Sequence, residues 1–191
     1  MRQVQRFCLL LLVGLATTSC SLLYYGYLPG GRYKYLRPRK KVELSGRCVA
    51  LKVVDHRAQR RAIDCSAIQL DRETELEGKK GVTLFEEYAK FIIEQAGGRI
   101  TSSCPDVLTI SIEGLSFSLI GVGYIVPHGL VQFRSSLDGR EQSYCTDMTD
   151  RDEDSPIGQY SLRTRRNASR MIVSGALRRT LEEMVSDLSQ Q

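Results

Sequence analysis

The chain has 191 residues, 42% of them hydrophobic, and a formal net charge of +5. The positive excess lies in one segment, because six basic and no acidic residues fall between Arg32 and Lys41, whereas residues 42–191 are net negative. A basic cluster interleaved with tyrosine can indicate nucleic-acid binding. The export signal described next excludes a cytoplasmic nucleic acid as the partner.

Residues 1–19 have the layout of a secretory signal. Arg2 and Arg6 precede an apolar run from Phe7 to Ala16, and small residues follow up to Ser19. The apolar run is much shorter than the roughly 20 residues that a membrane-spanning helix needs. We therefore predict that residues 1–19 are a signal peptide that is removed.

Cys20 follows the sequence Thr17-Thr18-Ser19. This resembles the lipobox of bacterial lipoprotein precursors: Thr18, Ser19 and Cys20 fit it, while Thr17 stands where leucine is expected. The resemblance implies acyl chains on the thiol and the amine of Cys20, and two or more chains suffice for stable anchoring. It also implies, from Ser21, an outer-membrane location facing the periplasm. An ordinary secretory signal, with Cys20 incidental, is the alternative.

Residues 20–41 are predicted to be a tether, basic and rich in tyrosine, glycine and proline. Its basic residues suit an anionic head-group surface beside the anchor, and a merely solvated linker is the alternative. Alternating apolar residues begin at Val42. Residues 42–191 therefore form a single predicted domain, long enough to bury about 70% of its unfolded surface in one core.

Four cysteines belong to this domain: Cys48, Cys65, Cys104 and Cys145. An even number in an exported chain predicts two disulfides. All three pairings stay open, and we favour Cys48 with Cys145 and Cys65 with Cys104, which would join strand to strand and loop to loop. Zinc is disfavoured because no paired-cysteine spacing exists, so no metal and no cofactor are expected.

The first predicted elements are a strand and a helix. Residues 48–54 alternate as a strand does, and apolar residues on both of its faces suggest a central position. Residues 57–81 are polar, with at most a short strand at 62–68. Thr83 and Glu86 form a capping box for a helix with one apolar stripe, which Gly97-Gly98 ends.

Three further strands and a second helix follow. Strands are predicted at 107–119, with a bend possible after Gly114, at 130–136 and at 141–148, and Asp138-Gly139 predicts a hairpin between the last two. Residues 151–155 form an acidic loop, read as a solvated turn rather than a calcium site, since the EF-hand pattern is absent. A helix is predicted over 160–188. Its apolar stripe is expected to pack on the sheet, and its arginines are expected to face water.

This order predicts an α+β fold, an antiparallel or mixed sheet of about four strands with two helices packed on one face. Together with the lipobox and the strand that ends at Asp55-His56-Arg57, it resembles the YajG-like family of small outer-membrane lipoproteins. That resemblance implies a periplasm-facing domain of poorly defined role, without catalytic residues to transfer.

No enzyme is expected, because no nucleophile motif, metalloprotease motif or phosphate-binding loop occurs. Asp55, His56 and Arg57 could be catalytic, but we favour a strand-ending turn, which explains the same residues. We expect a binding or structural module that contacts another envelope protein or polymer. The candidate surface within residues 118–131, alternatively part of the core, contains Leu119, Ile120, Val122, Ile125 and Val126. An auxiliary subunit of a lipid or lipopolysaccharide transport or assembly machine is the second hypothesis, and it requires an apolar groove or rim.

Overall fold

The computed structural model separates the chain into two compact units, Met1–Lys34 and Tyr35–Gln191. It describes residues 39–59, 65, 74–75, 78–157 and 165–190. The predicted signal, Cys20 and most of the tether lie outside the described residues. So does the possible short strand at 62–68, apart from Cys65.

The second unit contains one mixed sheet. Its strands lie in the order β3-β1-β4-β5-β6, and β2 pairs with β4 beside this path. β1 runs parallel to β3 and β4, while the other neighbours are antiparallel. The bounds are β1 Cys48–Asp55, β2 Thr74–Glu75, β3 Arg99–Ile100, β4 Asp106–Ile120, β5 Val126–Leu137 and β6 Arg140–Thr149. The α+β prediction is confirmed, with the two-residue strands β2 and β3 as additions.

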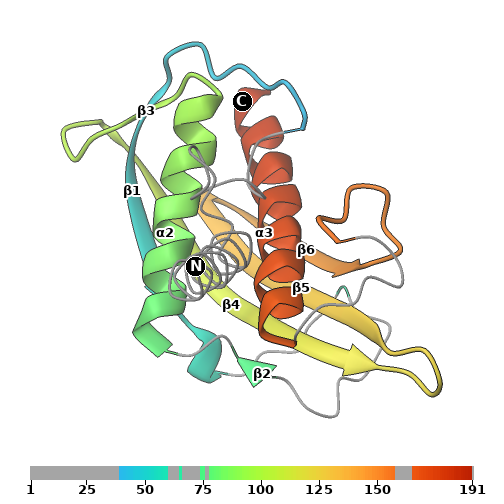
Figure 1. The fold of residues 1–191 in the computed structure, drawn as a ribbon. Coiled ribbons are helices and arrows are strands. Elements are labelled where there is room, and N and C mark those ends of the chain that lie inside the picture. Colours follow the sequence, from blue (N-terminus) through green and yellow to red (C-terminus); the bar gives the residue numbers. More distant parts are fainter. Residues whose placement is uncertain (1–38, 60–64, 66–73, 76–77, 158–164, 191) are drawn as a thin grey trace, which may run out of the picture. The chain divides into compact units, whose positions relative to one another are not determined.

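Two helices, α2 (Gly78–Gln95) and α3 (Arg165–Ser189), lie side by side on one face of the sheet (Figure 1). α2 packs near β1 and β3, and α3 packs on β5 and β6. The predicted apolar stripe of α2 is in the core: Phe85, Ala89, Ile92 and Ile93 are all at most 2% exposed. None of the described helices is long and apolar enough to cross a bilayer.

The two ends of α2 differ in how well local sequence specifies them. The helix begins at Gly78, five residues before Thr83, so the predicted capping box was wrong. A Thr-x-x-Glu pattern also fits within a helix, and here the helix already includes the five residues before Thr83. The predicted stop is confirmed. Gly97 has φ +78°, and the N–H groups of Gly97 and Gly98 donate to the carbonyls of Glu94 and Ile93 at 3.0 and 2.9 Å.

β4 is a single 15-residue strand with an irregularity between Ile112 and Gly114, at the predicted bend. β1 pairs with β4 before this point, and β2 pairs with it after this point. The hairpin from β5 to β6 turns at Asp138 and Gly139, whose φ angles are +52° and +76°. Positive φ at both residues is the geometry that Asp-Gly favours in two-residue hairpins, so this prediction is confirmed.

All four domain cysteines are paired, as Cys48–Cys104 and Cys65–Cys145, with Cα–Cα distances of 5.5 and 5.6 Å. The pairing that we favoured from sequence was therefore wrong. Strands β4 and β5 separate β1 from β6, so Cys48 and Cys145 are at least three strand spacings apart, which is roughly 14 Å or more. A disulfide needs Cα atoms within about 7 Å of each other. Cys104 instead follows β3, which pairs directly with β1 at Cys48.

The apolar positions predicted for the last helix are buried in α3: Val173, Leu177, Leu181, Met184 and Leu188 are at most 4% exposed. Gly129 of β5 allows the close approach of this helix. A methyl group at Gly129 would lie 2.8 Å from the carbonyl carbon of Ile172. The backbone of helix α3 therefore packs closely on β5 at Gly129.

Candidate contact site: an apolar hairpin tip

The connection between β4 and β5 forms a protruding loop. The two strands stay paired up to Ile120 and Val126, which leaves residues 121–125 outside the ladder. Gly121 has φ +139° and Gly123 has φ +87°. A methyl group at Gly121 would lie 2.2 Å from the carbonyl oxygen of Tyr124, so this turn requires glycine there.

Large aliphatic side chains gather on this loop. Val122 is fully exposed at 104%, Ile125 is 53% exposed and Leu119 is 41% exposed. We call these three residues the apolar tip. Ile120 and Val126, also named from the sequence, are half-buried, whereas Leu130 and Val131 are completely buried. Within residues 118–131, the strands therefore line the core and the loop faces outward, while a contact role of the loop stays a prediction.

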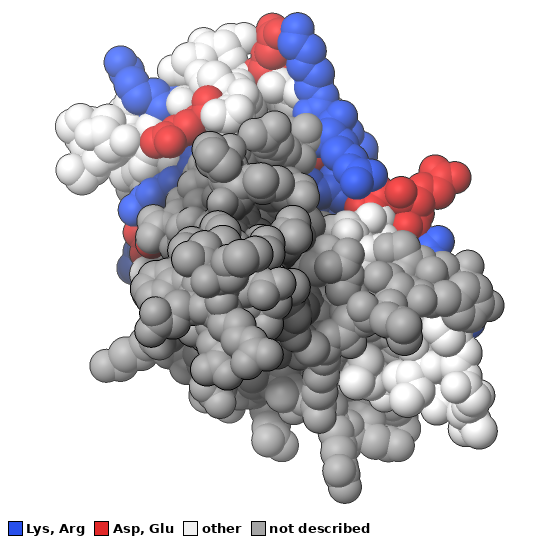
Figure 2. All heavy atoms as spheres, in the orientation of Figure 1, with Lys and Arg blue, Asp and Glu red and all other residues white. Residues whose placement is uncertain are grey.

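The tip lies in an uncharged stretch of chain, because no Asp, Glu, Lys or Arg occurs from Gly114 to Phe133. Figure 2 shows uncharged side chains at the lower right, where the β4–β5 hairpin ends in Figure 1. Elsewhere on this face, the acidic and basic side chains of the described residues lie close to one another. The tip itself therefore carries no charged side chain.

Tyr124 connects the loop to the segment that follows β6. Its hydroxyl donates a hydrogen bond to Asp150 Oδ2, and the guanidinium of Arg151 lies 5.7 Å from the centre of its ring. Asp150 is only 6% exposed, and its other oxygen, Oδ1, has no hydrogen-bond partner within the described chain. A buried carboxylate makes the Tyr124 hydrogen bond valuable, since losing it would leave a charged group unpaired.

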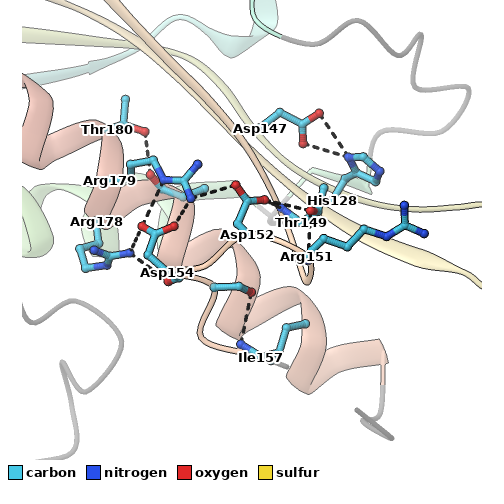
Figure 3. A network of polar contacts seen from close by, with 12 residues as sticks. His128, Asp147, Thr149, Arg151, Asp152, Asp154, Ile157, Arg178, Arg179 and Thr180 are labelled. Atoms are coloured by element: carbon cyan, nitrogen blue, oxygen red, sulfur yellow. Dashed lines mark hydrogen bonds and ion pairs between the residues drawn. The ribbon is translucent and has the colours of Figure 1, made fainter. Parts of the chain in front are cut away.

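The segment after β6 is itself held against α3 by an arginine–aspartate network (Figure 3). The network consists of Asp152, Asp154, Arg178 and Arg179. Arg179 donates to Asp152 at 3.0 Å, and Arg178 donates to Asp154 at 2.5 Å. Asp152 Oδ2 also accepts the backbone N–H of Thr149 at 2.7 Å, which ties the network to the end of β6.

The network lowers the pKa values of its two aspartates. Partial burial by itself raises the pKa of Asp154, but hydrogen bonds and charges from Arg179 and Arg178 outweigh this and lower the pKa to about 2. The pKa of Asp152 is lowered in the same way, against the effect of burial, by Thr149 and Arg179. Both carboxylates are therefore ionised at neutral pH and act as fixed partners of the arginines.

The network corrects two expectations. The acidic loop is not a simple solvated turn, because Asp152 and Asp154 pair with arginines, and Arg178 does not face water, because it is 2% exposed. Arg178 also contacts Glu182 at 3.3 Å. Within the described residues, no group of three or more acidic, histidine or cysteine side chains could hold a metal ion. Asp147, which precedes the acidic loop in the sequence, accepts a hydrogen bond from His128 Nδ1 at 3.0 Å.

The Asp55-His56-Arg57 cluster has the contacts of a strand-ending turn. Arg57 binds both oxygens of Asp55, each at 2.8 Å, and its backbone N–H donates to Asp55 Oδ1 at 3.1 Å. The hydrogen bond from Arg57 lowers the pKa of Asp55, although burial opposes it. The backbone N–H of His56 donates to the Ile112 carbonyl at 2.8 Å. Asp55 and Arg57 are thus occupied with each other.

A second feature is a pocket of about 260 Å³ between α2, α3 and residues 39–42. Its apolar walls include Ile92, Ala96 and Val185, and Arg39, Lys40 and Lys41 lie along its edge. Glu182 of the wall accepts the backbone N–H of Arg39 at 2.5 Å. The pocket is slightly smaller than typical ligand sites, which span about 300–1,000 Å³.

No known family model matches the chain, and no curated protein matches it. Among solved structures it is similar to a DUF330 protein from Xanthomonas campestris, with 15% identity over 80% of this chain and 86% of that one and a TM-score of 0.41. A minor lipoprotein from Acinetobacter baumannii matches at 8% identity over 76% of this chain and 91% of that one, with a TM-score of 0.39. Rare lipoprotein B from Shewanella oneidensis matches at 12% identity over 75% of this chain and 88% of that one, with a TM-score of 0.34. Two of these three proteins are described as lipoproteins, but such low scores assign neither a family nor a function.

Proposed function

We propose that this chain is a bacterial cell-envelope lipoprotein, anchored by acyl chains on Cys20 and facing the periplasm from the outer membrane. The lipobox-like sequence motivates the anchor. The structural observation that supports it most is that Cys48, Cys65, Cys104 and Cys145 are all in disulfides. Disulfides persist in oxidising compartments outside the cytoplasm, and Cys20 and Cys8 are the other cysteines in the sequence.

We propose that the domain acts as a binding or structural module rather than as an enzyme. Its support is the contrast between the apolar tip and the polar clusters. The carboxylates of Asp55, Asp152 and Asp154 are bound by arginines, while the tip presents three aliphatic side chains outward. Exposed apolar clusters mark contact sites, so the tip is the proposed surface for a further envelope component.

The anchor is tested by replacing Cys20 with serine in the full-length precursor. The wild-type chain should incorporate labelled palmitate and sediment with membranes, and C20S should lose both properties. Cys8→Ser is the matched control, because Cys8 belongs to the predicted signal peptide and its loss should change neither. Membrane fractionation of C20S equal to wild type, or an intact N-terminus in the wild-type product, would reject the anchor.

The alternative function, an auxiliary subunit of an envelope lipid or lipopolysaccharide transport or assembly machine, has one observation in its favour. The pocket between α2 and α3 joins apolar walls to a cationic edge, as a site for an anionic lipid would. The test is mass spectrometry of the chain isolated from membranes under native conditions. Co-purified lipid that is released by Lys40→Glu would support this role, and its absence would reject it.

A further inference from the structure

We propose that the apolar tip inserts into the surface of a lipid bilayer, as a second membrane contact in addition to the acyl anchor. The inference rests on the proposed envelope location and names the component that the tip contacts. Leu119, Val122 and Ile125 would enter the boundary between head groups and acyl chains. The proposed partner of the tip is thus lipid, whereas the sequence analysis expected an envelope protein or polymer.

The composition of the tip suits lipid better than a protein partner. Protein–protein hot spots are enriched in tryptophan, tyrosine and arginine, whereas the exposed residues of the tip are aliphatic. A stable protein interface covers about 800 Å² on each partner, which is more than three side chains on one loop provide. A bilayer requires no complementary shape, only an apolar segment that carries no charged side chain of its own. The uncharged stretch from Gly114 to Phe133 meets that condition.

The backbone of the hairpin sets the depth of insertion. Strand pairing ends at Ile120 and Val126, so the peptide groups of residues 121–125 lie outside the ladder. Peptide groups without partners are unfavourable in the hydrocarbon core. The tip is therefore expected to stay near the interface, about 5–10 Å into the boundary region, as interfacial apolar segments do.

The residues at the base of the tip suit that depth. Arg151 is exposed and stacks on the ring of Tyr124. Tyrosine is favoured at the level of the lipid head groups, and an arginine near the membrane surface is attracted by anionic lipids. Glu153 is the exposed acid of the same loop, whereas Asp150 is engaged by Tyr124. A cation therefore lies beside Tyr124 of the loop.

The tip is also held in place before any contact. Tyr124 binds Asp150, and the following segment is fixed to α3 by Asp152 and Asp154 with Arg178 and Arg179. These contacts fix Tyr124, which lies between Val122 and Ile125 in the loop. A preorganised contact surface loses less conformational freedom on binding.

The tether is long enough for this contact. The chain from Cys20 to Arg39 can span at most about 60 Å when extended. β4, which leads to the tip, has 15 residues, a length of about 50 Å. A domain anchored through Cys20 can therefore turn its β4–β5 hairpin toward the membrane.

The absence of tryptophan from the chain provides a direct test. The acylated full-length product of Val122→Trp is reconstituted into vesicles of phosphatidylethanolamine and phosphatidylglycerol. Its emission should shift to shorter wavelength and be quenched by phospholipids that carry bromine near the carbonyl end of their acyl chains. Ser143→Trp, at an exposed position of β6, is the matched control and should show neither effect. Ile125→Trp is a second reporter and should behave like V122W.

Two results would overturn the proposal. Emission of V122W and I125W equal to that of S143W would place the tip in water. A blue shift without quenching by brominated lipid would mean that protein, either a partner or a second copy, covers the tip. The mass of the N-terminal peptide reports acylation of Cys20 separately. Failure of the anchor and failure of tip insertion are therefore distinguishable.

Discussion

The two antiparallel hairpins of the sheet have opposite kinds of ends. The β5–β6 hairpin turns through Asp138 and Gly139, and its end is exposed and polar. The β4–β5 hairpin turns through five residues that expose Val122 and Ile125. A polar two-residue turn needs no explanation beyond connecting two strands. The apolar loop, by contrast, exposes hydrophobic surface, and Tyr124 links it to Asp150, which directly precedes the loop held by the arginine–aspartate network.

Among the substitutions in the loops, the largest effect on stability is expected from breaking the arginine–aspartate network. Asp154→Ala would leave the buried guanidinium of Arg178 without its nearest carboxylate, and breaking such a pair reduces stability by about 3 kcal/mol. Glu141→Ala is the control in the other hairpin, because Glu141 is 57% exposed and pairs with Arg134 at the surface. The control should change stability by less than about 1 kcal/mol. Urea unfolding measures the free energy of unfolding of both variants. Equal losses of stability in the two variants would contradict the difference between the hairpins.

Acid should weaken the arginine–aspartate network. The pKa of Asp154 is lowered from 3.8 to about 2 in the folded chain. A lowered folded pKa contributes stability that is present above about pH 4 and is lost as the pH falls toward 2, with a size of about 2 kcal/mol. Asp154→Asn should be less stable than wild type at pH 6 and lose less stability on acidification. If the urea midpoints of the two proteins changed with pH in parallel, Asp154 would not be the source of the acid-dependent loss of stability.

The turns themselves should differ in their need for glycine. Gly121→Ala places a methyl group against the Tyr124 carbonyl at an unfavourable φ, and we expect a loss of about 2 kcal/mol. Gly139→Ala has no atom within 4 Å, so only its positive φ opposes the change, by about 1 kcal/mol. Thermal unfolding of both variants decides the order. A larger loss for G139A would contradict the tight turn at the tip.

Tyr124→Phe should have a smaller effect. It removes the hydroxyl that donates to buried Asp150, at an expected loss of about 1 kcal/mol. Faster amide hydrogen exchange in residues 121–125, with no change at Asp138 and Gly139, would show that the hydroxyl holds the tip. Unchanged exchange in both turns would show that other contacts fix the loop.

The smallest effect on stability is expected from Val122→Ser. The side chain is fully exposed, so the free energy of unfolding should change by less than about 0.5 kcal/mol. Leu130→Ala, at a completely buried position of the same hairpin, should reduce it by about 2–5 kcal/mol. A large loss in V122S would mean that Val122 packs against the domain.

The candidate site could be located from sequence only in outline. The glycines and aliphatic residues of the loop were visible, but their exposure was not, because the same pattern also fits a buried segment. Nothing in the sequence paired Tyr124 with Asp150, since these residues come from different loops and meet only in the folded hairpins. The arginines of α3 were expected in water, whereas a neighbouring loop supplies carboxylates that make the burial of Arg178 acceptable.

The sequence by itself determined the local elements. Alternation in β1 and β4, the helical spacing of Val173, Leu177 and Leu181, the Asp-Gly turn and the glycine stop at Gly97 are encoded within a few residues. Only the tertiary structure decided the disulfide partners, the start of α2 and which aliphatic residues face outward. The physical reason is distance along the chain. Periodicity records which face of an element is apolar, but strand order and packing decide which distant segment covers that face.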